Sequence, residues 1–205
     1  FVQIRRERLR QFGHPLTLSF VRDLGASQTQ ASGRYVMIGD LSQPRGGLMS
    51  SSHRSHQNGL DLDIWFQLAD SPPQANRSYP EADAPPTMVR ADGLAVNGLW
   101  GQDQRRLLKF AAEDARVERI FVNPAIKLAL CDNETGDRRW LRKIRPWRGH
   151  DAHFHVRLKC PKDSPACQDQ SPIPPGEGCG AELAWWFTDE ARKPKKGGGE
   201  KPSPP

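Results

Sequence analysis

Hydrophobic side chains alternate with other side chains in two parts of the chain, residues 60–66 and residues 152–158. The even-numbered positions of both segments are apolar. The odd-numbered positions carry Asp61, Asp63, Trp65, His153, His155 and Arg157. Because successive side chains of a β-strand point to opposite faces of its sheet, each segment predicts a strand with one apolar face and one largely polar face.

The pattern elsewhere predicts helices and further strands around this pair. Apolar residues at helical spacing, with a proline suited to a first helical turn, predict a helix over residues 14–26. Residues 103–115 predict an amphipathic helix, while residues 34–42 and 117–124 predict strands, the second closed by a turn. Residues 68–87 predict a loop rich in proline and alanine. We therefore expect an α+β fold with a central, mostly antiparallel sheet, helices and long loops.

Length and composition limit the organisation of the chain. Its 205 residues are enough for one domain with a sizeable core. We expect that domain over residues 1–187, followed by a disordered tail over 188–205, which is rich in lysine, proline and glycine. No run of 18 apolar residues predicts a transmembrane helix. Because the chain begins at Phe1 without a methionine, we expect a fragment or a processed form.

The net charge of +6 favours a polyanionic substrate or partner, although an ordinary basic surface would give the same value. Nucleic-acid binding is not supported, because no basic stripe with interleaved aromatic residues is present. The sequence does not choose an oligomeric state, and a homodimer stays open.

The four cysteines lie between residues 131 and 179 without a CxxC motif, which argues against a zinc finger. Their even number predicts two disulfides and hence an oxidising compartment. Three pairings are open to four cysteines. We favour a short loop closed by Cys160–Cys167, which leaves Cys131–Cys179 as the second bond. Free buried thiols are the alternative.

Five of the six histidines fall in or beside the two alternating segments. Zinc takes about four ligands from imidazole nitrogen, thiolate and carboxylate. The residues that could supply them are His53, His56, Asp61, Asp63, His150, His153 and His155. If the two predicted strands are neighbours, their polar faces converge, which predicts a zinc site on the face of the sheet.

The segment SHQNGLDLDIW fits the pattern S-H-x-x-G-x-x-x-D, and HFH fits the H-x-H motif that accompanies it. This pair resembles the zinc peptidases that comprise lysostaphin-type enzymes, D-Ala-D-Ala metallopeptidases and hedgehog domains. The stretches RIFVNPAIK, WLRKIRPW and GCGAELAWW make the resemblance closest to the penicillin-insensitive murein endopeptidase family. The similarity extends over roughly residues 1–187.

The resemblance implies that His56, Asp63 and His155 bind zinc, with His53 as a further ligand of the resting metal. It also implies that His153 is the catalytic histidine and that His150 lies close to the same site. Each of these assignments carries the family's role onto a matching position of this sequence.

Two acidic residues stay outside this ligand set. Asp61 is then a supporting or surface residue, because the family's spacing selects Asp63. Asp92 matches a position that can hold an extra metal in the family, but the expected partner position is Ala95, which argues against that site.

The function implied is a periplasmic, zinc-dependent endopeptidase that cuts peptidoglycan cross-links between D-alanine and meso-diaminopimelate. Penicillin would not inhibit it, because no SxxK or GxSxG motif offers a serine nucleophile. The partners are peptidoglycan stem peptides, whose carboxylates suit a basic protein. Candidates to contact them, or alternatively ordinary surface and core residues, are Arg142, Lys143, Arg145, Arg157, Trp140, Trp147, Trp185 and Trp186.

Two alternatives remain at this point. A D,D-dipeptidase or carboxypeptidase would use the same zinc site, but such relatives carry a glutamate where this chain has His150 or Asp151. A non-catalytic zinc-bound interaction domain is the other, and the presence of His153 argues against it.

Overall fold

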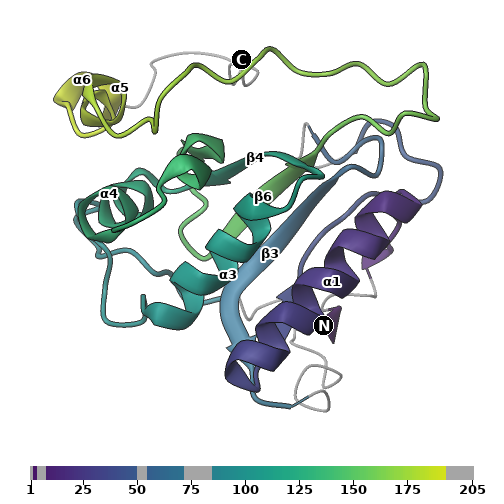
Figure 1. Cartoon of the computed structure of the whole chain (residues 1–205), viewed down its shortest axis with the longest axis horizontal. Coiled ribbons are helices and arrows are strands. Elements are labelled where there is room, and N and C mark those ends of the chain that lie inside the picture. The colour runs from purple at the N-terminus through teal and green to yellow at the C-terminus, as the bar shows by residue number, and fades with distance from the viewer. Residues whose placement is uncertain (1, 4–7, 50–54, 72–84, 193–205) are drawn as a thin grey trace.

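The computed structural model describes residues 2–3, 8–49, 55–71 and 85–192. Within this part of the chain, six strands form one sheet in the order β1-β2-β3-β6-β4-β5 (Figure 1). The strands are β1 (Val2–Gln3), β2 (Tyr35–Ile38), β3 (Asp61–Ala69), β4 (Val117–Val122), β5 (Ile144–Pro146) and β6 (His153–Leu158). The helices are α1 (Pro15–Ser32), α3 (Gln102–Glu113), α4 (Pro124–Asn133), η2 (Arg139–Lys143, a 3₁₀ helix), α5 (Ala181–Trp185) and α6 (Asp189–Arg192).

The three central pairings of the sheet, β2–β3, β3–β6 and β6–β4, are antiparallel. The outer strands β1 and β5 pair in parallel with β2 and β4. The expected α+β fold with a mostly antiparallel sheet is therefore confirmed. The two alternating segments, which are about ninety residues apart in the sequence, are direct neighbours as β3 and β6.

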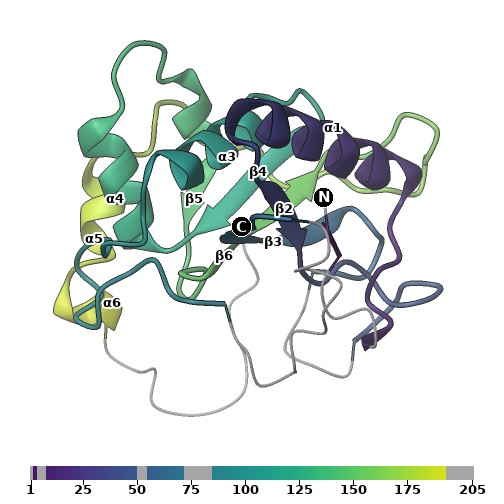
Figure 2. The same cartoon turned by 90° about the horizontal axis from the view of Figure 1, so that it is seen from below.

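One face of the sheet carries the main hydrophobic core. Figure 2 shows α1 and α3 lying together over the same side of the strands. The core joins the even-numbered apolar residues of β3 and β6, such as Leu62 and Phe154, to Phe20 of α1 and Leu107 of α3. Since side chains alternate along a strand, the odd-numbered residues of β3 and β6 point away from these helices.

The helix over residues 14–26 begins as predicted but extends to Ser32. His14 is its N-cap, and its Nδ1 accepts a hydrogen bond from the backbone N–H of Leu16 at 3.1 Å. The polar stretch after Ala26 obscured the rest of the helix, in which Gln28 is buried. Gly33 ends the helix in the left-handed conformation that glycine adopts most readily.

The turn expected after the strand at 117–124 is instead the start of helix α4. Asn123 caps this helix by accepting a hydrogen bond from the N–H of Ala125, and Pro124 occupies its first position. Both residues are typical of a helix N-terminus.

Both predicted disulfides are present. Cys131, on α4, bonds to Cys179, and Cys160 bonds to Cys167, with Cα separations of 5.7 and 5.6 Å. The first links α4 to the segment that precedes α5, and so holds the C-terminal part of the described chain against the body of the fold.

The predicted tail contains the short helix α6, and its remaining residues 193–205 lie outside the described part of the chain. Most of the expected loop at 68–87 lies outside it as well. No helix in the described residues has the length and apolarity needed to cross a membrane.

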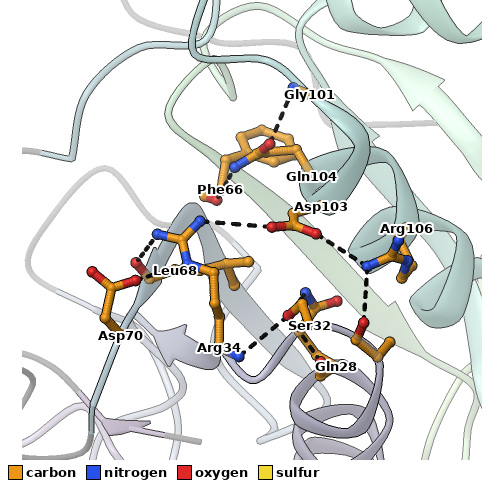
Figure 3. A network of polar contacts seen from close by, with 11 residues as sticks. Gln28, Ser32, Arg34, Phe66, Leu68, Asp70, Gly101, Asp103, Gln104 and Arg106 are labelled. Atoms are coloured by element: carbon orange, nitrogen blue, oxygen red, sulfur yellow. Dashed lines mark hydrogen bonds and ion pairs between the residues drawn. The ribbon is translucent and has the colours of Figure 1, made fainter.

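At the far end of β3, a polar network joins the strand to both core helices (Figure 3). Arg34 donates a hydrogen bond to the carbonyl of Leu68 and pairs with Asp70 and Asp103. Asp103 also pairs with Arg106 at 3.1 Å, within α3. We call Arg34, Asp70, Asp103 and Arg106 the Arg34 network.

Candidate metal centre

The turn before β3 brings His56 onto the polar face of the sheet. Gly59 has φ +76°, and a β-carbon there would lie 2.8 Å from the backbone nitrogen of His14, so only glycine fits this close approach. His56 is fully buried, and its Nδ1 is 2.9 Å from the carbonyl oxygen of Leu41. A carbonyl can only accept, so Nδ1 carries a proton and Nε2 is the ring nitrogen that faces the polar side of the sheet.

The register between β3 and β6 places Asp63 directly opposite His155. His155 Nδ1 lies 3.1 Å from Asp63 Oδ1, and His56 Nε2 lies 3.3 Å from the same oxygen. One ligand atom from each of these three residues lies within 4.8 Å of the others. All three are buried, so the structure brings together the three residues that the resemblance named as ligands.

A second carboxylate orients His155 from the other side. His155 Nε2 lies 2.9 Å from Asp61 Oδ1, and Arg157 donates a hydrogen bond to Asp61 Oδ2. When the proton of His155 is held on Nε2 by Asp61, Nδ1 is left with its lone pair toward Asp63. A carboxylate that fixes the tautomer of a metal-binding imidazole in this way is common around zinc.

The charges within the group shift the pKa values of its members strongly. Burial lowers the pKa of His155, but hydrogen bonds and charge from Asp61 and Asp63 outweigh it and raise the pKa to about 9. Burial raises the pKa of Asp63, yet His56, His153 and His155 together bring it well below its usual value. Asp63 is thus held as an anion, the form that binds metal ions.

His153 and His150 lie beside this group on its more open side. His153 is about one-third exposed, and its Nε2 is 3.8 Å from Asp63 Oδ1. The ring of His150 is centred 5.2 Å from that of His153 and 6.2 Å from that of His155. Burial, and then the nearby His153 and His155, lower the pKa of His150 to about 3, so its imidazole is neutral.

The backbone of His150 adopts φ 50°, which is unusual for a residue with a side chain. Asn123 holds this turn, because its backbone N–H donates to the carbonyl of His150 at 2.9 Å and its side chain donates to that of Gly149. Sequence reasoning missed this role, although Asn123 lies at the end of the strand predicted over residues 117–124.

Phe121 is another residue near the site that sequence reasoning missed. Its position on β4 is directly opposite His155 on β6, and the two ring centres are 5.8 Å apart. Its odd-numbered place on a predicted strand was visible in the sequence, but only the strand order β6-β4 brings it to the site.

Other candidates have different surroundings. Asp92 pairs with Arg90 at 2.8 Å and accepts a hydrogen bond from the N–H of Leu94. His53 lies outside the described residues. Trp140 is buried in the core rather than in a groove. Lys143 donates to the carbonyl of Asp114, and Arg142 to carbonyls in the segment before α5.

The donor set is suited to a divalent metal ion. Two imidazole nitrogens and one carboxylate oxygen meet at one point, which matches the three protein ligands of many catalytic zinc sites. Because Leu41 and Asp61 occupy the other ring nitrogens, Nε2 of His56 and Nδ1 of His155 face the shared point, and each would bind a metal once it carries no proton.

Comparison with known proteins identifies the family. The family model described as penicillin-insensitive murein endopeptidase matches residues 1–205. Curated proteins of that name are similar over most of their length. That of Pectobacterium atrosepticum is 46% identical over 98% of this chain and 71% of the relative. That of Yersinia enterocolitica is 47% identical over 95% of this chain and 70% of the relative. That of Klebsiella pneumoniae is 45% identical over 98% of this chain and 73% of the relative. The chain therefore belongs to the penicillin-insensitive murein endopeptidase family.

Proposed function

We propose that this protein is a zinc-dependent endopeptidase that hydrolyses peptidoglycan cross-links between D-alanine and meso-diaminopimelate. The single observation that carries this proposal is the convergence of His56, Asp63 and His155 in a chain of this family. Family membership supports peptidoglycan as the substrate. The nitrogen and carboxylate donor set supports zinc as the metal.

His56, Asp63 and His155 would hold the zinc ion. When bound, zinc supplies a Lewis acid that polarises a peptide carbonyl and lowers the pKa of a water molecule. The family resemblance adds His53 as a further ligand of the resting metal. Asp61 would keep His155 in the tautomer that presents Nδ1, and Arg157 holds Asp61 in place.

His153 would move the proton of the reaction. It is part of the same cluster but more exposed than the three ligands, so its ring can face a bound peptide. It would take a proton from the attacking water and return it to the leaving amine. The neutral imidazole of His150, packed against His153, would assist by accepting or donating a hydrogen bond.

Insensitivity to penicillin follows from this chemistry, because β-lactams inhibit by acylating a serine nucleophile. The proposal assigns no serine to the reaction. The two disulfides support an extracytoplasmic location, and we propose the periplasm, where a peptidoglycan hydrolase meets its substrate.

The test uses a purified muropeptide dimer with a defined D-alanine–diaminopimelate cross-link and the full chain, assayed as prepared, after chelation and after zinc is restored. We expect monomers to appear only when zinc is present, at a rate unchanged by penicillin. Monomeric pentapeptide is the comparison substrate, because release of its terminal D-alanine alone would indicate a carboxypeptidase. Zinc binding without cleavage of either substrate would indicate a non-catalytic domain and contradict the proposal.

A further inference from the structure

A single row of residues crosses the sheet from the candidate metal centre to its edge. Asp63 on β3 is paired with His155 on β6, His155 with Phe121 on β4, and Phe121 with Arg145 on β5. Paired residues in neighbouring strands project to the same face. At about 4.8 Å per strand, the backbone of Arg145 is about 10 Å from that of His155 across the sheet.

Beyond Phe121, this row opens into a hollow of about 110 Å³. Its walls are aromatic and its rim is charged. Phe121 packs against Trp147 with ring centres 5.7 Å apart, and Trp147 packs against Trp186 at 6.1 Å. Arg145 and Glu182 also line it. Because Phe121 also packs against the rings of His155 and His150, the hollow adjoins the candidate metal centre, with Phe121 between them.

Arg145 and Glu182 lie side by side on the rim, whereas Arg119, which also lines the hollow, is buried and pairs with Glu118 at 3.1 Å. Arg145 Nη1 and Nη2 donate to Glu182 Oε1 and Oε2, both at 3.2 Å. The Glu182 side chain is 42% exposed, so the pair contributes little to stability and a ligand can open it at small cost. A β-carbon on Gly178 would lie 2.6 Å from Glu182 Oε1, so the absence of a side chain there leaves space for this pair.

We propose that this hollow is a subsite for the free amino-acid end of diaminopimelate, with Arg145 binding its carboxylate and Glu182 its ammonium group. The aromatic walls would pack against the aliphatic chain that carries this end. Arg145 and Glu182 together match the negative and positive charges of such a zwitterion. A ligand with a carboxylate alone would pair with Arg145 but would be repelled by the carboxylate of Glu182.

A cross-link contains two diaminopimelate residues, one on each stem. The distance between the candidate metal centre and the hollow indicates which of them is bound, an inference that rests on the proposed function. On the acceptor stem, the terminal amine is consumed by the cross-link and the adjacent carboxylate lies within a few bonds of the scissile nitrogen. On the donor stem, the free end is separated from the scissile carbonyl by a D-alanine and an aliphatic side chain. A separation of about 10 Å along the row matches the donor stem.

The test measures kcat and KM of the zinc-loaded protein on cross-linked dimers with three forms of the donor diaminopimelate: free, amidated at the carboxylate, or acetylated at the amine. We expect each modification to raise KM about tenfold, equivalent to about 1.4 kcal/mol, with little change in kcat. Arg145→Gln should remove the effect of amidation, and Glu182→Gln the effect of acetylation. Amidation of the acceptor diaminopimelate should change KM by the same factor in the wild type and in Arg145→Gln.

Asp137→Asn and Arg139→Gln are matched controls, because these two residues form a similar exposed pair outside the hollow. Both should keep the wild-type discrimination. Equal KM values for all three donor forms in the wild type would overturn the subsite.

A binding measurement without cleavage distinguishes failure of the proposed function from failure of the subsite. If the wild type cleaves no dimer, calorimetry with uncross-linked tetrapeptide still tests the hollow. Binding that Arg145→Gln and Glu182→Gln weaken would support the subsite, and absence of binding would refute it.

Discussion

Two polar regions share strand β3 but differ in the cations that face their carboxylates. In the Arg34 network, arginines pair with Asp70 and Asp103, and all of these side chains are at least a quarter exposed. In the candidate metal centre, Asp63 is 8% exposed and faces the imidazoles of His56, His153 and His155.

The contrast shows how the choice of cation separates a structural network from a binding site. A guanidinium is always charged and has no lone pair, so an arginine that pairs with a carboxylate cannot bind a metal ion beside it. An imidazolium can lose a proton near neutral pH, and the lone pair that is then exposed can bind a metal ion. Asp61, which pairs with both Arg157 and His155, links these two kinds of partner within one site.

The largest effect is expected from removing the imidazole that the two carboxylates orient. His155→Ala should lose both zinc and endopeptidase activity, because it removes one of the three proposed ligands and leaves Asp61 and Asp63 close together without their shared partner. Zinc content of the purified variant and the cleavage rate of a defined dimer measure this directly. Full zinc occupancy in His155→Ala would contradict the ligand set.

His153→Ala should separate binding from chemistry. We expect it to keep its zinc and to lose roughly 10²–10⁴-fold in turnover, the range expected when a general acid–base is removed. Metal stoichiometry and kcat should be measured beside those of His155→Ala. Near-normal turnover would transfer the role to His150 or to water, and loss of zinc would make His153 a ligand.

Asp61→Asn should weaken zinc binding by about 10- to 100-fold, because an amide orients the ring of His155 less firmly than a carboxylate. Competition with a chelator of known affinity gives the change. Asp61→Glu serves as a second variant that keeps the charge. Unchanged affinity in Asp61→Asn would show that the hydrogen bond from His155 has no effect on the metal.

The smallest effect is expected in the Arg34 network. Asp103→Asn should lower the free energy of unfolding by roughly 0.2–1 kcal/mol, since partly exposed ion pairs contribute little. It should leave zinc affinity and turnover unchanged. Denaturant unfolding measures the change in stability, and zinc content together with the dimer assay checks that the centre is unaffected. A loss of zinc in Asp103→Asn would contradict the distinction between the two regions.

The sequence predicted the candidate centre better than it predicted its surroundings. The spacing of His56, Asp63 and His155 matched a known motif, and alternation placed the last two on polar strand faces. Asn123 and Phe121 gave no comparable signal, because their roles depend on contacts with residues of other elements. Arg145 and Trp147 were candidates, but Glu182 was not, since the pair forms only where α5 packs beside β5.

Alternating side chains, helix caps and cysteine number are local properties, so the sequence by itself determined the two central strands, the start of α1 and an oxidised fold. It also determined which residue types were available for a metal. The tertiary structure alone decided that β6 lies between β3 and β4, and with what register. That register depends on burying the apolar faces of three distant segments together under α1 and α3. A shift of one residue would turn each histidine to the opposite face of the sheet, which is why long-range packing, rather than the motif, places Asp63, His155, Phe121 and Arg145 in one row.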